Sequence, residues 1–169
     1  MINRKEYIHR RTVISNRFEK EKKIFEKVQP FLKGNIGLYM PAFGEVNILQ
    51  FMPYEHCYFP VVLNDTMMAF YRYTQSLNQG KFHILEPKKE NKIMPKDLDV
   101  VICPMVAFSG LFRIGYGKGY YDRYLQKTNA KKIGIAFDCQ YTNDFIPKKT
   151  DVEMDLLITE TKIVTKEDI

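Results

Sequence analysis

The residues best suited to chemistry lie in one segment, where three glycines alternate with a tyrosine and a lysine from Gly115 to Gly119. Alternate glycines let the backbone turn tightly and present several N–H groups to one side. A helix is predicted to begin near Tyr120, and its positive end would face the same place. Arg113 and Lys118 add positive charge. The segment therefore predicts an anion site of the kind that holds a triphosphate.

Other interpretations of this segment remain open from the glycines alone. It is not a P-loop, because no Gly-Lys-Ser/Thr follows a four-residue spacer, and it reads GxGxG rather than the dinucleotide pattern GxGxxG. A glycine-rich turn leading into a helix fits the glycines equally well. Asp122 can likewise be an ordinary first-turn acid, which stabilises a helix by about 0.3–1 kcal/mol.

The segment follows the clearest predicted strand, residues 98–103, a mostly apolar run closed by Pro104. Residues 132–137 and 154–159 are similar runs, and strands that are apolar on both faces are typical of a parallel sheet covered by helices. Ligands bind beyond the carboxyl ends of such strands. Further strands are expected at 35–40, 58–63, 67–73 and 81–85, helices at 45–52 and 120–128, and a surface loop at 86–97. This alternation predicts an α/β fold, a single three-layer domain with a mostly parallel central sheet flanked by helices.

The N-terminal segment carries the whole charge excess of the chain. Residues 1–33 hold ten Lys and Arg against four Glu, whereas the remainder is balanced, so the net charge of +6 resides here. Residues 3–14 and 16–29 read as helices, with Asn16 and Glu19 at capping-box spacing and Pro30 ending the second. The basic segment is either a polyanion site or a solvated helical face, and charge alone favours the latter.

Composition limits the class of protein. The chain has 169 residues, 45% hydrophobic and 27% charged, which fits one globular domain over 1–169. No apolar run approaches the ~20 residues of a membrane helix, and no apolar stretch follows the basic start as in a secretory signal. Cys57, Cys103 and Cys139 form no CxxC pair and fit a reducing compartment, so a cytoplasmic protein is expected.

Short motifs in a fixed order span nearly the whole chain. They are Gly44-Glu45-Val46, Glu86-Pro87, residues 99–104, Val106-Ala107-Phe108, residues 113–125, residues 134–137, Gln140, Ile146-Pro147, Asp151-Val152, Asp155 and residues 158–160. In these motifs the sequence resembles the 5-formyltetrahydrofolate cyclo-ligase family. The block from 113 to 125 and the later Asp155 are the specific parts of the resemblance.

The resemblance implies Mg²⁺- and ATP-dependent conversion of 5-formyltetrahydrofolate to 5,10-methenyltetrahydrofolate, with ADP and phosphate released. It implies Lys118 and Arg113 as catalytic residues, Met40 and Glu45 in the folate pocket, and Asp122 and Asp155 as ligands of Mg²⁺. The expected ATP-binding residues are Asn3, Arg4, Lys5, Glu6, Tyr7, Arg113, Ile114, Gly115, Tyr116, Gly117, Lys118, Gly119, Tyr120 and Tyr121.

Several of these residues also have a purely structural interpretation. Glu45 can be the first acid of a helix, and Asp155 a strand-edge acid facing solvent. Whether Lys5 or Arg10 meets the phosphates is open. Phe51, Tyr54 and Phe108 are candidates for stacking on the pterin ring, with a place in the core the safer interpretation.

Two other classes of function compete with a folate ligase. The basic N-terminal helices and the tyrosines would suit an RNA-binding module, although no nucleic-acid motif is present and residues 34–169 are neutral overall. A sugar-phosphate isomerase or CoA-type transferase on a similar fold would need no ATP. We therefore expect 5-formyltetrahydrofolate and ATP as partners, with no nucleic acid and no membrane, and a monomeric protein.

Overall fold

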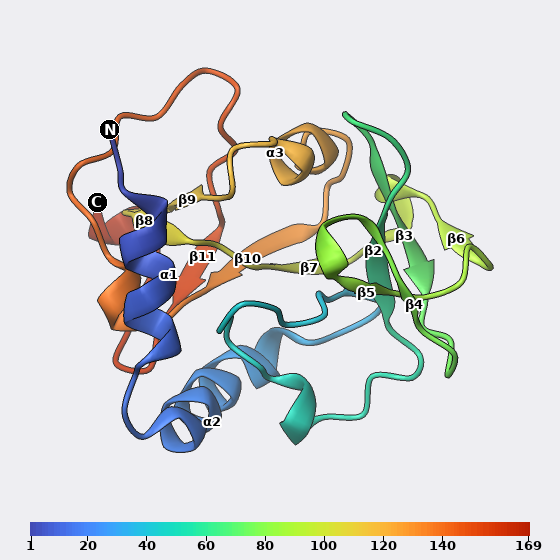
Figure 1. The fold of residues 1–169 in the computed structure, drawn as a ribbon, viewed down its shortest axis with the longest axis horizontal. Helices are drawn as coiled ribbons and strands as arrows, with labels where there is room; N and C mark the ends of the chain where they lie inside the picture. Colours follow the sequence, from blue (N-terminus) through green and yellow to red (C-terminus); the bar gives the residue numbers. More distant parts are fainter.

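An eight-stranded sheet forms the centre of the molecule in the computed structural model, which describes residues 1–169 (Figure 1). The strand order is β12-β11-β10-β7-β1-β2-β3-β6. Strands β11, β10, β7, β1 and β2 are parallel to one another, and β12, β3 and β6 add antiparallel edges. The elements are α1 (Arg4–Thr12), α2 (Arg17–Val28), β1 (Ile36–Gly37), β2 (Tyr58–Val62), β3 (Met68–Arg72), β4 (Asn78–Gln79), β5 (Leu85–Glu86), β6 (Lys92–Ile93), β7 (Val100–Cys103), β8 (Ala107–Ser109), β9 (Phe112–Ile114), α3 (Tyr120–Leu125), β10 (Lys131–Ile135), β11 (Leu156–Ile158) and β12 (Ile163–Val164).

Helices cover both faces of this sheet, as the apolar strands predict. Along β7, Val100 and Ile102 pack in the cluster that contains Ile24 and Val28 of α2. Their neighbours Val101 and Cys103 pack in the cluster that contains Tyr124 and Leu125 of α3. Successive side chains of a strand point to opposite faces, so one strand serves both cores. Figure 1 shows α2 and α3 on opposite sides of the strands. The prediction of a three-layer α/β fold is confirmed.

The two N-terminal helices form where the sequence predicts them, but the predicted capping box is wrong. Asn16 precedes α2 in a left-handed conformation, with φ of 52°, and its side chain makes no capping hydrogen bond. Val28 ends α2, and Pro30 lies in the 3₁₀ turn that follows. Helix α1 packs against the 3₁₀ turn Asp138–Gln140 that follows β10.

The helix predicted over residues 45–52 does not form. Only Leu49–Phe51 makes a 3₁₀ turn. Asn47 Oδ1 accepts a hydrogen bond from the Leu49 backbone N–H at 3.0 Å, and Tyr39 Oη donates to the Val46 carbonyl at 2.6 Å. Side-chain bonds to the backbone therefore replace the helical ladder, as asparagine near a turn favours.

Several further boundaries differ from the predictions, and β1, for example, spans Ile36–Gly37 instead of residues 35–40. The strand expected at 81–85 is a 3₁₀ turn, Lys81–His83, followed by β5, because Phe82 and His83 both have positive φ. The loop expected at 86–97 contains the short edge strand β6. Helix α3 ends at Leu125 instead of residue 128. None of these differences disturbs the five parallel strands at the centre.

The β8–β9 hairpin explains how a glycine segment far along the chain from β7 still lies at the end of that strand. The Val106 backbone N–H donates to the Ile114 carbonyl at 2.7 Å, which closes the hairpin. The chain therefore returns to Met105, next to the carboxyl end of β7, before Gly115 begins. The candidate site is built at this edge of the sheet. None of the helices is both long and apolar enough to cross a membrane.

Candidate functional site

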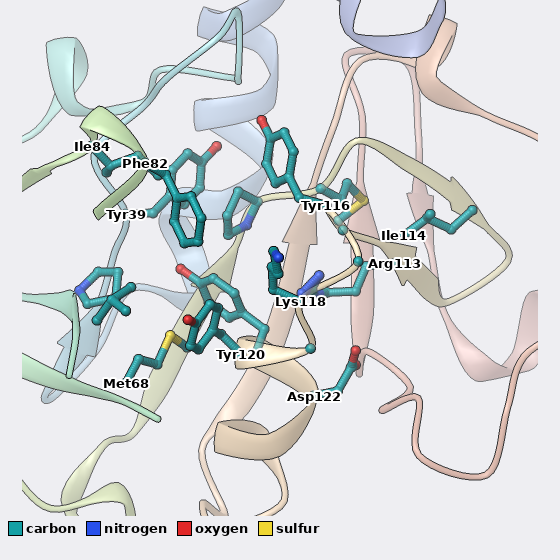
Figure 2. Close-up of a pocket in the computed structure, with 18 of the residues that line it drawn as sticks. Tyr39, Met68, Phe82, Ile84, Arg113, Ile114, Tyr116, Lys118, Tyr120 and Asp122 are labelled. Carbon is teal, nitrogen blue, oxygen red and sulfur yellow. The ribbon is translucent and has the colours of Figure 1, made fainter. Parts of the chain in front are cut away.

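A cavity of about 1060 Å³ opens beyond the carboxyl ends of β1 and β7 (Figure 2). Its walls come from α1, the turn before Glu45, residues 115–119, the start of α3 and the segment around β5. Figure 2 shows Tyr39 and Phe82 on one side of the cavity and Tyr116 and Arg113 on the other. Pockets for single drug-sized ligands measure about 300–1,000 Å³. The volume of this cavity is therefore at the upper limit of that range.

Residues 115–119, the glycine loop, have the backbone that the glycine pattern predicts. Gly117 and Gly119 adopt φ of 97° and 72°, which side chains disfavour, and Gly119 directly precedes α3. A β-carbon at Gly115 would lie 2.9 Å from Arg113 Nη1, so the guanidinium would have to shift to make room for a side chain there. The loop is tight because cationic side chains pack directly against it.

Three cationic side chains lie at this loop, two from neighbouring elements and one from the loop itself. Arg4 of α1 donates from Nε to the Gly115 carbonyl at 2.7 Å. Arg113 of β9 is 7% exposed, lies 4.9 Å from the centre of the Tyr121 ring, and has no hydrogen-bond partner for its Nε. Lys118 is exposed and lines the cavity without an acidic partner. This concentration of unpaired positive charge is suited to a polyphosphate.

The predicted ATP-binding residues of α1 are brought together only in part. Arg4 lines the cavity, as does Ile8 one turn later, but Asn3, Lys5, Glu6 and Tyr7 do not. Arg10 pairs with Glu6 and lies over the Tyr7 ring, which places it on another side of the helix. Of the basic residues considered from the sequence for the phosphates, Arg4 is the one that reaches the glycine loop. All nine residues predicted from 113 to 121 line the cavity.

Glu45 and Met40, the predicted folate residues, both line the same cavity. Glu45 follows the turn at Gly44 and begins no helix, so its interpretation as a helix-terminal acid is wrong. It is 7% exposed and accepts one hydrogen bond, from the Ala42 backbone N–H at 2.9 Å. Burial raises the pKa of Glu45 to about 7, although Arg11, the Ala42 N–H and Arg113 oppose the rise. A largely desolvated carboxylate with free acceptor capacity can bind a ligand that offers N–H groups.

Only one of the two predicted metal ligands lines the cavity. Asp122 lines it and accepts from the Val152 backbone N–H at 3.2 Å, whereas Asp155 does not line it and accepts from the Lys132 N–H at 2.8 Å. Burial raises the pKa of the Cys103 thiol to about 12, and both carboxylates contribute to the rise. The two aspartates therefore act electrostatically on the same thiol. No group of three His, Cys, Asp or Glu side chains is placed to hold a metal ion.

The aromatic residues of the cavity are different from those singled out in the sequence. Phe108 is 1% exposed in the core and Tyr54 packs on Tyr73 at 5.2 Å against the core, so the safer interpretation of these two is confirmed. Phe51 is half-buried and stacks on Phe25 at 5.6 Å, outside the cavity. The sequence offers no signal for the aromatic wall that replaces them, because it depends on tertiary contacts. That wall includes Tyr39, Phe43, Phe82 and Phe145, besides the tyrosines of residues 116–121.

The fold and the cavity define an α/β enzyme whose site combines a basic glycine loop with a buried carboxylate. The profile of the 5-formyltetrahydrofolate cyclo-ligase family matches residues 2–160. The chain is 36% identical to the 5-formyltetrahydrofolate cyclo-ligase of Mycoplasma genitalium, over 82% of each chain, and 31% identical to that of Mycoplasma pneumoniae, over 93% and 96%.

Solved structures agree with this relationship. The 5,10-methenyltetrahydrofolate synthetase of Mycoplasma pneumoniae superposes with a TM-score of 0.75 at 29% identity, covering 93% of this chain and 96% of that one. The enzyme of the same name from Aquifex aeolicus gives 0.81 at 28% identity, covering 98% and 92%. The chain belongs to the 5-formyltetrahydrofolate cyclo-ligase family, and it is accordingly a ligase of folate metabolism. The resemblance noted in the sequence is confirmed.

Proposed function

We propose that the protein uses MgATP to cyclise 5-formyltetrahydrofolate to 5,10-methenyltetrahydrofolate, releasing ADP and phosphate. The observation that carries the proposal is that one cavity contains two chemically different groups. Arg4, Arg113 and Lys118 lie at the glycine loop, and the buried carboxylate of Glu45 lines the same cavity. The cations suit a triphosphate, and the carboxylate suits the N–H groups of a neutral pterin ring.

The chemistry requires a phosphoryl group to be transferred before the ring can close. The oxygen of a formyl amide is a poor leaving group, so direct attack by N10 on the formyl carbon stalls. Transfer of the γ-phosphoryl group to that oxygen gives an iminium phosphate and ADP. N10 then bonds to the formyl carbon, its proton is lost, and the C–O bond breaks to release inorganic phosphate.

The role of the protein in such a reaction is to position the reactants and to neutralise charge. Lys118 and Arg113 would neutralise the phosphoryl oxygens, and Arg4 would hold the triphosphate against the glycine loop. Glu45 and Met40 would orient the pterin so that the formyl oxygen faces the γ-phosphate. Tyr116 and the other loop residues would limit access of water to that phosphate.

Asp122 and Asp155 are the residues that would hold Mg²⁺. Magnesium commonly takes one or two carboxylates and completes its shell with phosphate oxygens and water, so two aspartates fit. Both act electrostatically on the Cys103 thiol, and each uses one carboxylate oxygen for a backbone hydrogen bond, which leaves the other oxygen without a protein donor. When bound, the ion would supply neutralisation of the developing phosphate charge.

The decisive test is to incubate the purified protein with 5-formyltetrahydrofolate and MgATP. We expect ADP and the near-ultraviolet absorbance of methenyltetrahydrofolate to appear together, and neither to appear when ATP or the folate is left out. Lys118→Gln should lower turnover strongly, whereas the control Lys127→Gln, an exposed residue outside the cavity, should not. Product formed without ATP, or no ADP and no methenyl product, would show that the proposal is wrong.

A further inference from the structure

Arg11 is a fully buried arginine that has no carboxylate partner. Its side chain is 0% exposed, and none of the ion pairs includes it. The guanidinium donates from Nε to the Phe43 carbonyl at 2.9 Å, from Nη1 to the Met105 carbonyl at 2.8 Å and from Nη2 to Tyr116 Oη at 2.6 Å. Burying a guanidinium is costly even when it is hydrogen-bonded. Arg11 therefore keeps a full positive charge in the interior beside neutral acceptors.

The three acceptors belong to the three segments that meet at the cavity. Phe43 lies in the turn before Glu45, Met105 follows β7, and Tyr116 lies in the glycine loop. Gly44 has φ of 79°, and a β-carbon there would lie 2.9 Å from Thr12 Oγ1 and 3.4 Å from Arg11 Cγ. Helix α1 and the Glu45 turn are thus in close contact. The guanidinium therefore joins the turn before Glu45 to the glycine loop.

The charge of Arg11 also acts on Glu45. Arg11 is the strongest of the groups that oppose the burial-driven rise in the pKa of Glu45, ahead of the Ala42 N–H and Arg113. The other titratable groups near Glu45 are Tyr39, Tyr116 and Tyr121, from the end of β1, the glycine loop and α3. Burial raises the pKa of all three tyrosines, so they stay neutral near pH 7.

A second cavity, of about 380 Å³, also has Glu45 in its lining. Arg17 and Glu21 line it, but these two residues pair with each other, Nη1 to Oε1 at 2.9 Å. Their charges largely cancel at Glu45. Among all charged groups facing the carboxylate, Arg11 and Arg113 are therefore the ones that favour its ionised form, and Arg113 also packs against the glycine loop at Gly115.

We propose that Arg11 is a positioning residue for folate binding, which clamps the Glu45 turn to the glycine loop and holds Glu45 in the ionised form that accepts the pterin N–H groups. This rests on the proposed function, because it assumes that Glu45 binds the folate. Arg11 would not touch either substrate. It would act through Glu45, by charge and by geometry, and its loss would change the pH at which the folate binds.

The experiment is to measure the Kd of 5-formyltetrahydrofolate by titration calorimetry without ATP, across about pH 5.5–9. Wild-type affinity should rise with pH through about 7, where Glu45 ionises. Arg11→Gln keeps a polar side chain but removes the charge, and a nearby arginine typically lowers a carboxyl pKa by about 1–3 units. The midpoint should therefore rise by about one pH unit, which makes binding about fivefold weaker at pH 7. Arg11→Lys should keep the wild-type midpoint.

Two controls separate this effect from a general loss of structure. Arg10→Gln, on the exposed side of the same helix, should leave both affinity and midpoint unchanged. Glu45→Gln should abolish the pH dependence between about pH 6 and 8, and adding Arg11→Gln to it should leave the affinity independent of pH. Thermal melting of each variant checks that it is folded.

The outcomes distinguish the inference from the proposed function. If the wild-type protein does not bind the folate, the proposed function fails. If it binds with the expected pH dependence but Arg11→Gln weakens binding equally at every pH, Arg11 is only structural and the inference is overturned. A midpoint raised as much in Arg11→Lys as in Arg11→Gln overturns it as well. If Arg11→Gln does not fold, the midpoint of Arg11→Lys decides, since an upward shift of a full pH unit there is incompatible with a role for the charge.

Discussion

Glu45 lowers the stability of the unliganded protein, and the same carboxylate can bind a ligand. Its carboxylate is buried with one hydrogen bond, and burial raises its pKa from 4.5 to about 7. A raised folded-state pKa means that the associated stability is complete below about pH 4.5 and is lost as the pH rises through about 7. At neutral pH, ionised Glu45 therefore lowers the free energy of unfolding of the unliganded protein. A ligand that donates N–H groups to the carboxylate can offset this loss.

Glu45→Gln should make the unliganded protein more stable at alkaline pH. At about pH 8 the gain should be about 3 kcal/mol, because each pKa unit is worth about 1.4 kcal/mol. For a chain of this length that corresponds to a rise of roughly 6–12 °C in Tm. The gain should fall towards zero at about pH 4, where the wild-type carboxyl is protonated in both states. Thermal melts at the two pH values test this, and an equal gain at both would mean that ionisation of Glu45 is not the cause.

At the scale of the elements, the sequence predicts best those helices and strands whose local residue pattern directly reflects their burial. Strand β7 is buried on both faces, so the apolar composition of its residues is enough to predict a strand covered on both sides. The segment 45–52 has a helical composition, but Asn47 and Tyr39 redirect its backbone through side-chain hydrogen bonds. The turn at Phe82 needs positive φ at two non-glycine residues, which no local pattern encodes. Tertiary contacts decide these places, and they are the places that form the cavity wall.

The same limit applies to the candidate site. The glycine loop, Glu45 and Asp122 were found in the sequence because their residue types and order are distinctive. Arg11 was not, because a basic residue in a basic helix carries no signal of its own. Only the packing of α1 shows that Arg4 and Arg11 face inward while Lys5 and Arg10 face outward. The charge excess of the N-terminal segment is therefore partly a solvated face and partly a component of the site.

Helix α1 should accordingly act on nucleotide binding through one residue of its first turn. Arg4→Gln removes a cation that hydrogen-bonds the glycine loop and lines the cavity. A charge-assisted hydrogen bond contributes about 1.5–3 kcal/mol, so ATP affinity should fall about 10- to 100-fold, while folate affinity changes little. Lys5→Gln is the matched control, because Lys5 is exposed outside the cavity, and its ATP affinity should stay within about twofold of wild type. Calorimetric titrations with MgATP compare the two, and an equal loss in both variants would contradict this placement of the helix.

At the scale of the whole molecule, the cavity depends on segments from both ends of the chain. Its lining runs from Arg4 in the first helix to Asp151 just before β11. The parallel strands bring these segments to one edge of the sheet, and the β8–β9 hairpin returns the glycine loop to the same edge. The fold therefore places residues that are far apart in sequence around one substrate space. Asp122 of α3 lines this space, whereas Asp155, which precedes β11, lies outside it.

Asp122→Asn and Asp155→Asn should each lower turnover by orders of magnitude if the two aspartates hold one Mg²⁺ against the phosphates of ATP. Both variants should stay folded, because an asparagine oxygen can still accept the backbone hydrogen bonds from Val152 and Lys132. Residues that act as one unit give non-additive losses, so the double variant should be scarcely slower than the slower single variant.

The alternative roles of the two aspartates predict different behaviour. An acid that only stabilises the start of a helix, as Asp122 can, should cost about 1 kcal/mol of stability or less and leave catalysis near normal. An Asp155 that only accepts the Lys132 N–H should likewise leave turnover unchanged. Steady-state rates, thermal midpoints and the Mg²⁺ dependence of ATP binding, measured for the three variants, separate these cases. A shared site requires weaker Mg²⁺-dependent ATP binding in both single variants. Wild-type turnover in Asp155→Asn, or fully additive rate losses in the double variant, would contradict it, because two carboxylates on one ion cannot contribute independently.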